Sequence, residues 1–554
     1  MKPPPRAFCG FGEGAGSNES RNEGDLLKRV NLPTAPLVAV VVCILGLTVA
    51  WSRALPGVFY DDGLYLLIAR SLAAGQGLHY AGVPGTPAAA KYPPLFPFLL
   101  SLVWRLRPGP AAFPAFQLLN VVLAALGAGA FAAYLQRGLG YPRAFAAGVA
   151  LAAWWTVDTW RYAVIPLSEP LFTLAFVFVL LAASRLERSR RPAIDTAFVL
   201  LAFAAAYYAR SIGIVAGMAP VAALLLARRW RLAAALAAGV AAVMLPWWLW
   251  SAGAARTVPA SLADVLGPYS AWLEEQLRAS PAGFASSLVG NGLRLGSRVI
   301  DTVLPDVPAA ARWVLAPPLL MLAGVGARDL WRRSRTAVLA PVFFLGALAL
   351  WPFVARRLLA PVAPLLILMV AAGFLAATRV PSLRLRRLAA LAGALWGLWF
   401  AGTATLRLAQ RRHDDVLVSR SAELADAAAA VRAWTPPGAV IGSAELWAGI
   451  HLLTGRPVAP SALFRPVSTS GEPVWGTPAR QIALWQSVGM QYLWVAPGAP
   501  VEGDALRDLA RICGPGAARV LGGSQNGALV RIGLSAACRA RLASSGATVA
   551  VSPR

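Results

Sequence analysis

Long apolar runs recur along almost the whole chain, and they constrain its fold more than any other feature. A helix that crosses a bilayer needs roughly 17–25 mostly apolar residues, and eleven runs approach or reach that length. They lie near 35–53, 112–135, 143–160, 168–184, 193–209, 212–227, 232–251, 312–327, 336–354, 359–378 and 388–406. The composition also indicates a membrane protein, because 58% of the 554 residues are hydrophobic and only 14% are charged. We predict a polytopic α-helical membrane protein with about 11 transmembrane helices.

A twelfth run, 92–106, is short and ends at Arg105, and the arginines of the chain decide whether it crosses. If the N-terminus is cytoplasmic and this run does not cross, the arginine-rich loops near 137, 188, 229, 332 and 384 all face the cytoplasm, as the positive-inside rule requires. We therefore predict that 92–106 is a helix lying on or dipping into the outer leaflet. The outer side then holds the 54–111 loop, the 252–311 loop and everything after about 407.

The polarity of the chain predicts three regions. Residues 1–33 are polar and predict a disordered cytoplasmic tail, 34–412 form the transmembrane domain, and 413–554 form a small extracytoplasmic α/β domain. In this last region "GAVIGS" and "QYLWVA" predict buried strands, and "ELWAGIHLLTG" predicts a helix that ends at Gly455. Cys513 and Cys538 either pair there, if the region is outside the cell, or remain free thiols.

Several function classes are disfavoured. The net charge of +26 does not indicate nucleic-acid binding, because the arginines cluster at the ends of apolar runs. The predicted spans have no ionisable residue near their middles, where ion-coupled transporters need one. This favours an enzyme that acts at the membrane interface. A lipid or sugar translocator without chemistry is the alternative, and a scaffold for the outer C-terminal domain is a third hypothesis.

Acidic residues stand at two predicted outer positions. Asp61 and Asp62, in "FYDDGLYLLIARSLAAGQGLHY", are predicted to open an amphipathic helix. Its apolar face is expected to consist of Leu64, Leu67, Ile68 and Leu72. Acids in a first turn cap a helix, but one of these can instead act as a base or metal ligand. Adjacent carboxylates disfavour each other's ionisation unless a cation balances them. Glu169, in "SEPLF", is either a first-turn residue or a second acid of the same site.

Cationic residues are also expected on the outer side. Lys91 precedes paired prolines in "KYPPLFPFLL", and it is either a snorkelling lysine or a phosphate contact. Arg356 and Arg357 in "WPFVARRLLAPVAP", together with Arg210 in "YYARSIGI", face outward in this topology. The positive-inside rule does not place them there, and arginine suits bidentate phosphate binding. We expect an anion-binding role for Arg210 and for Arg356 or Arg357.

The order of these motifs resembles the GT-C superfamily of integral-membrane glycosyltransferases, which use polyprenyl-phosphate sugars. The acidic pair, "GQGLHY", "KYPPLFPFLL", "SEPLF" and "RRLLAPVAP" carry the resemblance over most of 35–406. It is greatest to bacterial members akin to the aminoarabinose transferases of lipid A and the protein O-mannosyltransferases. The segment "TPPGAVIGSAELWAGIHLLTGRPVAP" resembles the soluble domain that ends many such chains. The resemblance implies a GT-C transferase (EC 2.4 class) of the bacterial inner membrane, with lipid A modification among its possible roles.

The resemblance also implies roles for individual residues. Asp61 takes the catalytic place, and Glu169, where the family often has Asp, is the second acid. Many members bind a divalent metal between such acids, so Mg or Mn held by Asp61 and Glu169, with Asp62 nearby, is an open expectation. The donor phosphate would be held by Lys91, Arg210, Arg356 and Arg357. A sugar would pass from a polyprenyl-phosphate donor to an acceptor hydroxyl or amine at the outer face. Lipid, glycan and protein acceptors all stay open.

Overall fold

The apolar runs of the sequence correspond to helices in the computed structural model. The structure describes residues 33–351, 356–462 and 476–544, so the predicted tail 1–33 lies outside the described residues except for Pro33. Each of the eleven runs contains a helix. These are α1 Thr34–Thr48, α4 Phe113–Ala133, α5 Arg143–Trp154, α7 Glu169–Leu186, α8 Pro192–Ala209, α9 Ile214–Leu226, α10 Trp230–Ala255, α14 Ala309–Arg333, α15 Thr336–Ala349, α16 Ala363–Ala377 and α17 Leu383–Ala409.

The helices differ in whether their length alone suits a membrane. Within the described residues, six helical segments are long and apolar enough to cross: Gly109–Gly138, which contains α4, and helices α7, α8, α10, α14 and α17. The other five have between 12 and 15 residues. At 1.5 Å per residue they span roughly 18–23 Å, less than the hydrocarbon thickness of roughly 30 Å. The count of eleven spans therefore stays a prediction.

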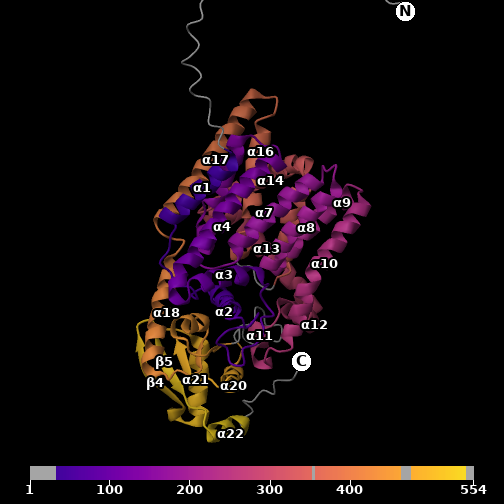
Figure 1. The fold of residues 1–554 in the computed structure, drawn as a ribbon. Helices are drawn as coiled ribbons and strands as arrows, with labels where there is room; N and C mark the ends of the chain where they lie inside the picture. The colour runs from indigo at the N-terminus through magenta and orange to yellow at the C-terminus, as the bar shows by residue number, and fades with distance from the viewer. Residues whose placement is uncertain (1–32, 352–355, 463–475, 545–554) are drawn as a thin grey trace, which may run out of the picture.

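The bundle is held together by close helix packing (Figure 1). Helix α4 packs against α1 and α7, α7 packs against α8, and α14 packs against α16. At the last of these contacts, a Cβ on Gly326 would collide with the carbonyl oxygen of Met369, and a Cβ on Gly373 with that of Leu322. Small residues let helix backbones approach this closely, as is common inside membranes.

The segments predicted to share the outer side all lie at one end of the bundle. Helices α2 Asp61–Ala73, α3 Leu95–Leu106, α11 Ala263–Leu266 and α12 Tyr269–Ala279 are found toward the end of the bundle at which the C-terminal region lies (Figure 1). The 252–311 loop is largely helical, because it also contains the whole of α13 Pro281–Val303. Which side of a membrane this end faces stays a prediction.

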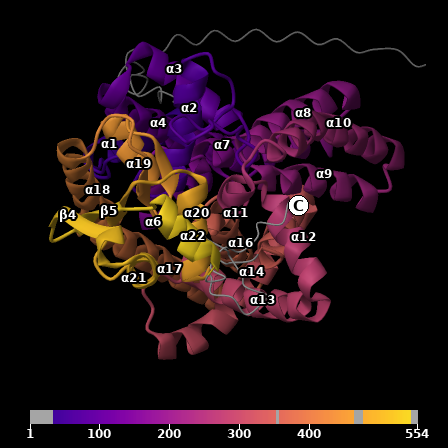
Figure 2. The same ribbon diagram turned by 90° about the horizontal axis from the view of Figure 1, so that it is seen from below.

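The amphipathic character predicted for α2 is wrong. Every residue from Asp62 to Ala69 is buried, and Leu72 is only half-buried. The physical reason is that α3 and the C-terminal helix α19 Trp447–Thr454 both pack against α2 (Figure 2). Helix α3 is the next helix along the chain, whereas α19 comes from the distant C-terminal region, and together they leave α2 without a free polar face.

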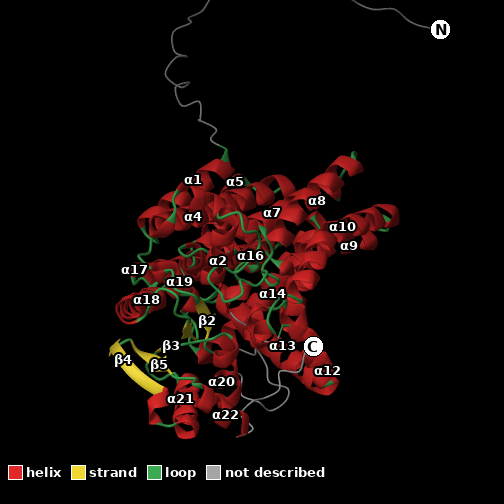
Figure 3. Cartoon of the chain, turned by 60° about the horizontal axis from the view of Figure 1, so that its bottom comes forward, coloured by secondary structure: helices red, strands yellow, loops and turns green. Residues whose placement is uncertain are grey.

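The C-terminal region contains a mixed five-stranded sheet (Figure 3). After α18 Asp415–Trp434 come β1 Ile441–Ser443, β2 Val458–Pro460, β3 Tyr492–Val495, β4 Ala518–Ser524 and β5 Gly527–Ile532, with helices α19, α20 Pro478–Ser487, α21 Pro500–Cys513 and α22 Ala536–Ser544. The strand order is β2-β1-β3-β5-β4, and β1 is parallel to both of its neighbours. The predicted strands and helix are confirmed, and Gly455 ends the helix with a φ of 70°. Cys513 and Cys538 form a disulfide.

Hydrogen bonds fix this C-terminal region onto the loop that leads to α2. The Leu55 N–H donates to Ser421 Oγ over 2.8 Å, and Arg420 donates to the Val58 carbonyl over 3.0 Å. Arg70 of α2 lies 2.9 Å from His451 of α19. The loop that precedes Asp61 and Asp62 is therefore held against α18 of the C-terminal region.

Candidate active site

The two adjacent aspartates have different partners, because Asp62 turns back to the loop that precedes α2. Tyr60 precedes the helix with a φ of 76°, and Asp62 accepts three backbone N–H groups, from Gly57 (2.6 Å), Phe59 (3.0 Å) and Gly63 (2.8 Å). Burial raises the pKa of Asp62 to about 6, although these hydrogen bonds lower it. Asp62 is fully buried, and each of its carboxylate oxygens accepts a hydrogen bond from the backbone of the loop before the helix.

Asp61 instead faces a buried arginine that joins it to Glu169. Arg357 Nη1 lies 2.6 Å from Asp61 Oδ2, and Arg357 Nε also contacts Glu169 Oε1. Arg210 forms a second ion pair with Glu169. The chain thus brings the start of α2, the start of α7, the end of α8 and the short helix Arg356–Leu359 (η5) to one point. Four of the predicted site residues meet there.

Tyrosine and serine hydroxyls complete this cluster. Tyr92 donates its hydroxyl to Asp61 Oδ1 over 2.5 Å, so each oxygen of Asp61 has a partner. Tyr65 and Ser168 share a hydrogen bond of 2.8 Å, and Arg210 lies 3.4 Å from the same serine oxygen. Sequence reasoning missed these hydroxyls, although Tyr92 and Ser168 stand inside the quoted motifs "KYPP" and "SEPLF".

The electrostatics of the cluster keep Asp61 ionised. Burial alone would raise its pKa, but Arg357, the Tyr92 hydroxyl and the Lys91 charge together lower it below the usual aspartate value. The opposite charges also hold the pKa of Arg357 well above its usual range, against the effect of burial. The site therefore contains a charged carboxylate held by a permanently charged guanidinium.

Lys91 lies in an aromatic pocket close to this cluster. Its ammonium donates to the Val265 carbonyl over 3.0 Å and sits 4.4 Å from the ring centre of Trp272 and 4.8 Å from that of Tyr269. Burial lowers its pKa to about 8, while the charge of Asp61 acts in the opposite direction. A lysine that is 5% exposed is not a snorkelling residue at an interface.

The structure separates the two adjacent arginines that the sequence left as alternatives. Arg356 pairs with Asp158 over 2.7 Å. It lines a different pocket of about 50 Å³, which also includes Asp301 and Arg407. Arg357 alone of the two contacts Asp61 and Glu169.

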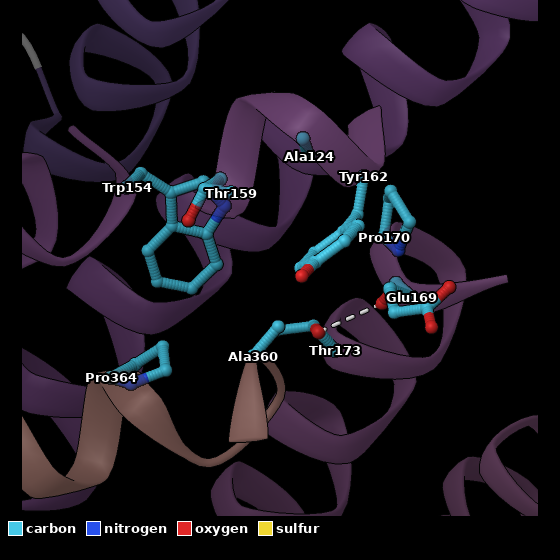
Figure 4. Close-up of a pocket in the computed structure, with 9 residues that line it drawn as sticks. All are labelled: Ala124, Trp154, Thr159, Tyr162, Glu169, Pro170, Thr173, Ala360 and Pro364. Carbon is cyan, nitrogen blue, oxygen red and sulfur yellow. Dashed lines mark hydrogen bonds between the residues drawn. The ribbon is translucent and has the colours of Figure 1, made fainter. Parts of the chain in front are cut away.

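A small pocket of about 30 Å³ adjoins Glu169 on the bundle side (Figure 4). Trp154, Tyr162 and Pro364 form much of its wall, and Thr173 Oγ1 donates to the Glu169 backbone carbonyl over 2.8 Å. Among the described residues, Glu169 Oε2 and Arg357 Nη2 are buried and lack a hydrogen-bond partner. Buried polar atoms without partners are rare, so this cluster has an acceptor and a donor available to a ligand.

The acids do not fit a shared divalent metal in this arrangement. The Arg357 guanidinium bridges Asp61 and Glu169, and it occupies the position that a cation held by both acids would take. No group of three or more His, Cys, Asp or Glu side chains in the described part of the chain is placed to hold a metal. Asp62 is turned away and satisfied by backbone N–H groups.

Comparison with known proteins finds similarity in structure. No protein-family model matches the chain, and no curated protein matches its sequence. ArnT from Cupriavidus metallidurans in the apo state is similar with a TM-score of 0.54 and 14% identity, covering 90% of this chain and 97% of that one. The same protein bound to undecaprenyl phosphate is similar with a TM-score of 0.49 and 15% identity, covering 91% of this chain and 98% of that one. The oligosaccharyltransferase of Archaeoglobus fulgidus in complex with Zn and sulfate is similar with a TM-score of 0.52 and 12% identity, covering 84% of this chain and 68% of that one.

The chain has the GT-C fold. Together with its apolar helices, this fold makes the chain a multi-pass membrane protein. The GT-C resemblance predicted from the order of short motifs is thus confirmed at the level of fold. The structural similarity does not assign roles to Asp61, Glu169, Lys91, Arg210, Arg356 or Arg357, so these remain predictions.

Proposed function

We propose that this protein is a glycosyltransferase that moves a sugar from a polyprenyl-phosphate donor to an acceptor hydroxyl or amine. The observation that carries the proposal is the buried contact of Arg357 with both Asp61 and Glu169. Three cationic side chains, Lys91, Arg210 and Arg357, gather around Asp61 and Glu169 there, and cationic donors of this kind are suited to a phosphate.

The chemistry follows from the positions of these groups. Asp61 takes the proton from the acceptor hydroxyl or amine, whose oxygen or nitrogen attacks the anomeric carbon. The bond between that carbon and the phosphate oxygen breaks, and polyprenyl phosphate leaves with the electron pair. A phosphate leaving group needs cations more than a general acid, and Arg357 Nη2 is a buried donor without a partner in the described chain. Arg210 and Lys91 add positive charge to the same region.

The donor also provides a way to activate Asp61. While Arg357 holds Asp61, its charge lowers the pKa of that carboxylate and makes it a weaker base. A phosphate that draws the guanidinium toward itself would weaken this contact and raise the pKa of Asp61. Proton abstraction contributes about 10²–10⁴-fold in enzymes of this kind.

We place this site at the outer face of the bacterial inner membrane, with the N-terminus in the cytoplasm. Two features support the placement: the arginine-rich loops predicted to face the cytoplasm and the Cys513–Cys538 disulfide, which suits an oxidising compartment. The acceptor, whether lipid, glycan or protein, would reach the site between the outer loops and the C-terminal sheet.

The test is a donor screen with the purified full chain in nanodiscs. Several undecaprenyl-phosphate sugars are supplied with candidate acceptors, and released undecaprenyl phosphate is measured. We expect one donor to be consumed and Asp61→Asn to abolish its consumption, with unchanged expression and thermal stability within a few degrees. Asp158→Asn, which removes an acid outside the cluster, serves as the matched control. Wild-type turnover by Asp61→Asn would exclude Asp61 as the base. Transbilayer movement of the lipid-linked sugar in proteoliposomes, without release of undecaprenyl phosphate, would favour a translocator.

A further inference from the structure

A cavity in the C-terminal region shares no lining residue with the Asp61 cluster. Its volume is about 260 Å³, against about 30 Å³ beside Glu169 and about 50 Å³ beside Arg356. This is well above the volume that a single water molecule needs, so the cavity has room for a small polar ligand. Ser443, Ala462, Ala496 and Gly498 are among the small residues that line it.

Strand topology explains why a cavity forms here. Ser443 ends β1, Ala462 follows β2, and Ala496 follows β3, so all three contribute from the carboxyl ends of parallel strands. From β1 the chain passes to β2 on one side and then returns past β1 to β3 on the other. Right-handed connections therefore send α19 and α20 to opposite faces of the sheet. This is a topological switch point, the usual place for ligands in open α/β sheets.

The lining of the cavity is acidic and polar. Glu423, Glu445 and Glu502 line it together with one arginine, Arg420. Arg420 is paired with Glu445, and Glu502 accepts from Ser461 Oγ over 2.9 Å. Burial raises the pKa of Glu423, although the neighbouring Trp494 and Arg420 lower it. The excess of carboxylates repels phosphate and accepts hydrogen bonds from hydroxyl or ammonium groups.

Trp494 supplies an aromatic wall and a donor. Its side chain is 1% exposed and lines the cavity. The indole lies beside the Glu423 carboxyl, but no described residue accepts a hydrogen bond from its Nε1 in good geometry. A buried donor of this kind calls for an acceptor, and a sugar hydroxyl can both accept from the indole and donate to a glutamate.

The cavity is also connected to the Asp61 loop. Arg420, which lines the cavity, donates to the carbonyl of Val58, three residues before Asp61. The neighbouring Ser421 accepts from the Leu55 N–H. A ligand in the cavity would therefore contact α18, the helix that holds the loop before Asp61 in place.

We propose that this cavity binds a neutral or amino-bearing sugar unit of the acceptor. The inference rests on the proposed transferase function, because it assigns the cavity to the acceptor and leaves the donor phosphate to the Asp61 cluster. The carboxylates bind hydroxyl and ammonium groups, Trp494 covers one side of the ring, and the α18 side chains link the subsite to Asp61.

The test measures binding to the full chain in nanodiscs by saturation-transfer NMR. The probes are glucosamine, glucose and inorganic phosphate. We expect saturable binding of glucosamine or glucose that weakens at least tenfold in Glu423→Gln and in Ala444→Trp, because Ala444 also lines the cavity and an indole there would fill it. Asp426→Asn is the control, because Asp426 is on the same helix but bonds Ser524 and Asn526 outside the cavity. Thermal unfolding checks that every variant is folded.

The outcomes separate this inference from the proposed function. If neither sugar binds, or if both bind equally to wild type and Ala444→Trp, the cavity is not a sugar subsite, whatever the donor screen shows. Stronger binding of phosphate than of either sugar would also overturn the inference. If the sugars bind as expected but no donor is consumed, the subsite stands and the transferase proposal fails. With an active donor, Glu423→Gln should raise the acceptor KM and leave the donor KM unchanged.

Discussion

Replacing Arg357 with alanine tests the central contact of the proposed site. The side chain is 10% exposed and pairs with Asp61 and with Glu169, whose side chain is 4% exposed. Two charges about 4 Å apart attract by about 4 kcal/mol at an effective dielectric constant of about 20. Removing one partner of a buried ion pair typically costs about 3–5 kcal/mol. Because Glu169 keeps Arg210 and only Asp61 loses its ion-pair partner, the lower end of that range, about 3 kcal/mol, applies here. We expect Arg357→Ala to lower the free energy of unfolding by about that amount.

The same variant should lose activity and change its pH dependence. Loss of a preorganised group that stabilises transition-state charge costs about 10²–10³-fold in kcat, measured here as release of undecaprenyl phosphate. Arg357 lowers the pKa of Asp61, so without it that pKa rises and the acidic limb of the kcat/KM profile moves to higher pH. In the wild type, ionised Asp61 stabilises the fold above the ordinary carboxyl pKa of about 4, and this contribution is lost as pH falls. Arg357→Ala should lack this pH-dependent stabilisation by ionised Asp61.

Two further variants make this result interpretable. Arg357→Lys keeps the charge but cannot bridge two acids with a planar fork, so it should fold and still lose activity. Arg356→Ala removes the adjacent arginine, whose side chain is 36% exposed and pairs with Asp158. That pair is worth at most about 1 kcal/mol, and activity should stay within a few-fold of wild type. Equal losses in Arg356→Ala and Arg357→Ala, or wild-type turnover in Arg357→Ala, would refute the reasoning.

Three other results are expected. Asp62→Asn should lower the free energy of unfolding by about 1–3 kcal/mol, because an amide cannot accept on both sides from three backbone N–H groups. Its kcat per folded molecule, measured by active-site titration, should change far less than that of Asp61→Asn. A stable but inactive Asp62→Asn would contradict this prediction. Donor KM should rise as the pH passes about 8, where Lys91 loses its proton, and Lys91→Arg should remove that rise; an identical pH profile in the variant would exclude Lys91. Excess EDTA should leave turnover unchanged, because Arg357 already joins the two acids; restoration of lost activity by Mg²⁺ or Mn²⁺ would show that the guanidinium gives way to a metal.

The helices were predictable because their signal is local. An apolar run has the same composition whatever packs against it, and each of the eleven runs contains a helix. The face of α2 was not predictable in this way, because its cover comes from α3 and from α19, almost 400 residues along the chain. The strands β1 and β3 were found from buried apolar residues, but their shared edge and its cavity depend on strand order.

Adjacent residues of the same type mark the limit of sequence reasoning at the site. Successive side chains of an α-helix point about 100° apart and those of a 3₁₀-helix about 120° apart. Asp61 and Asp62 therefore diverge at the start of α2, and Arg356 and Arg357 diverge in η5. The sequence identified both pairs, but the backbone decides which member enters the cluster.

The arrangement of the cluster implies an order of events in transfer. Asp61 has one oxygen bonded to Tyr92 and the other to Arg357, and these contacts hold its pKa below the usual aspartate value, so in this state Asp61 is a weak base. Tyr92 has its pKa held well above the usual tyrosine value by burial and by the nearby Asp61 charge, so it stays a donor. Arg357 is then the group that must move, and a phosphate is the ligand whose charge and geometry compete best for a guanidinium. Donor binding would therefore precede activation of the base, and the site would stay inactive toward acceptors until the lipid-linked sugar is in place.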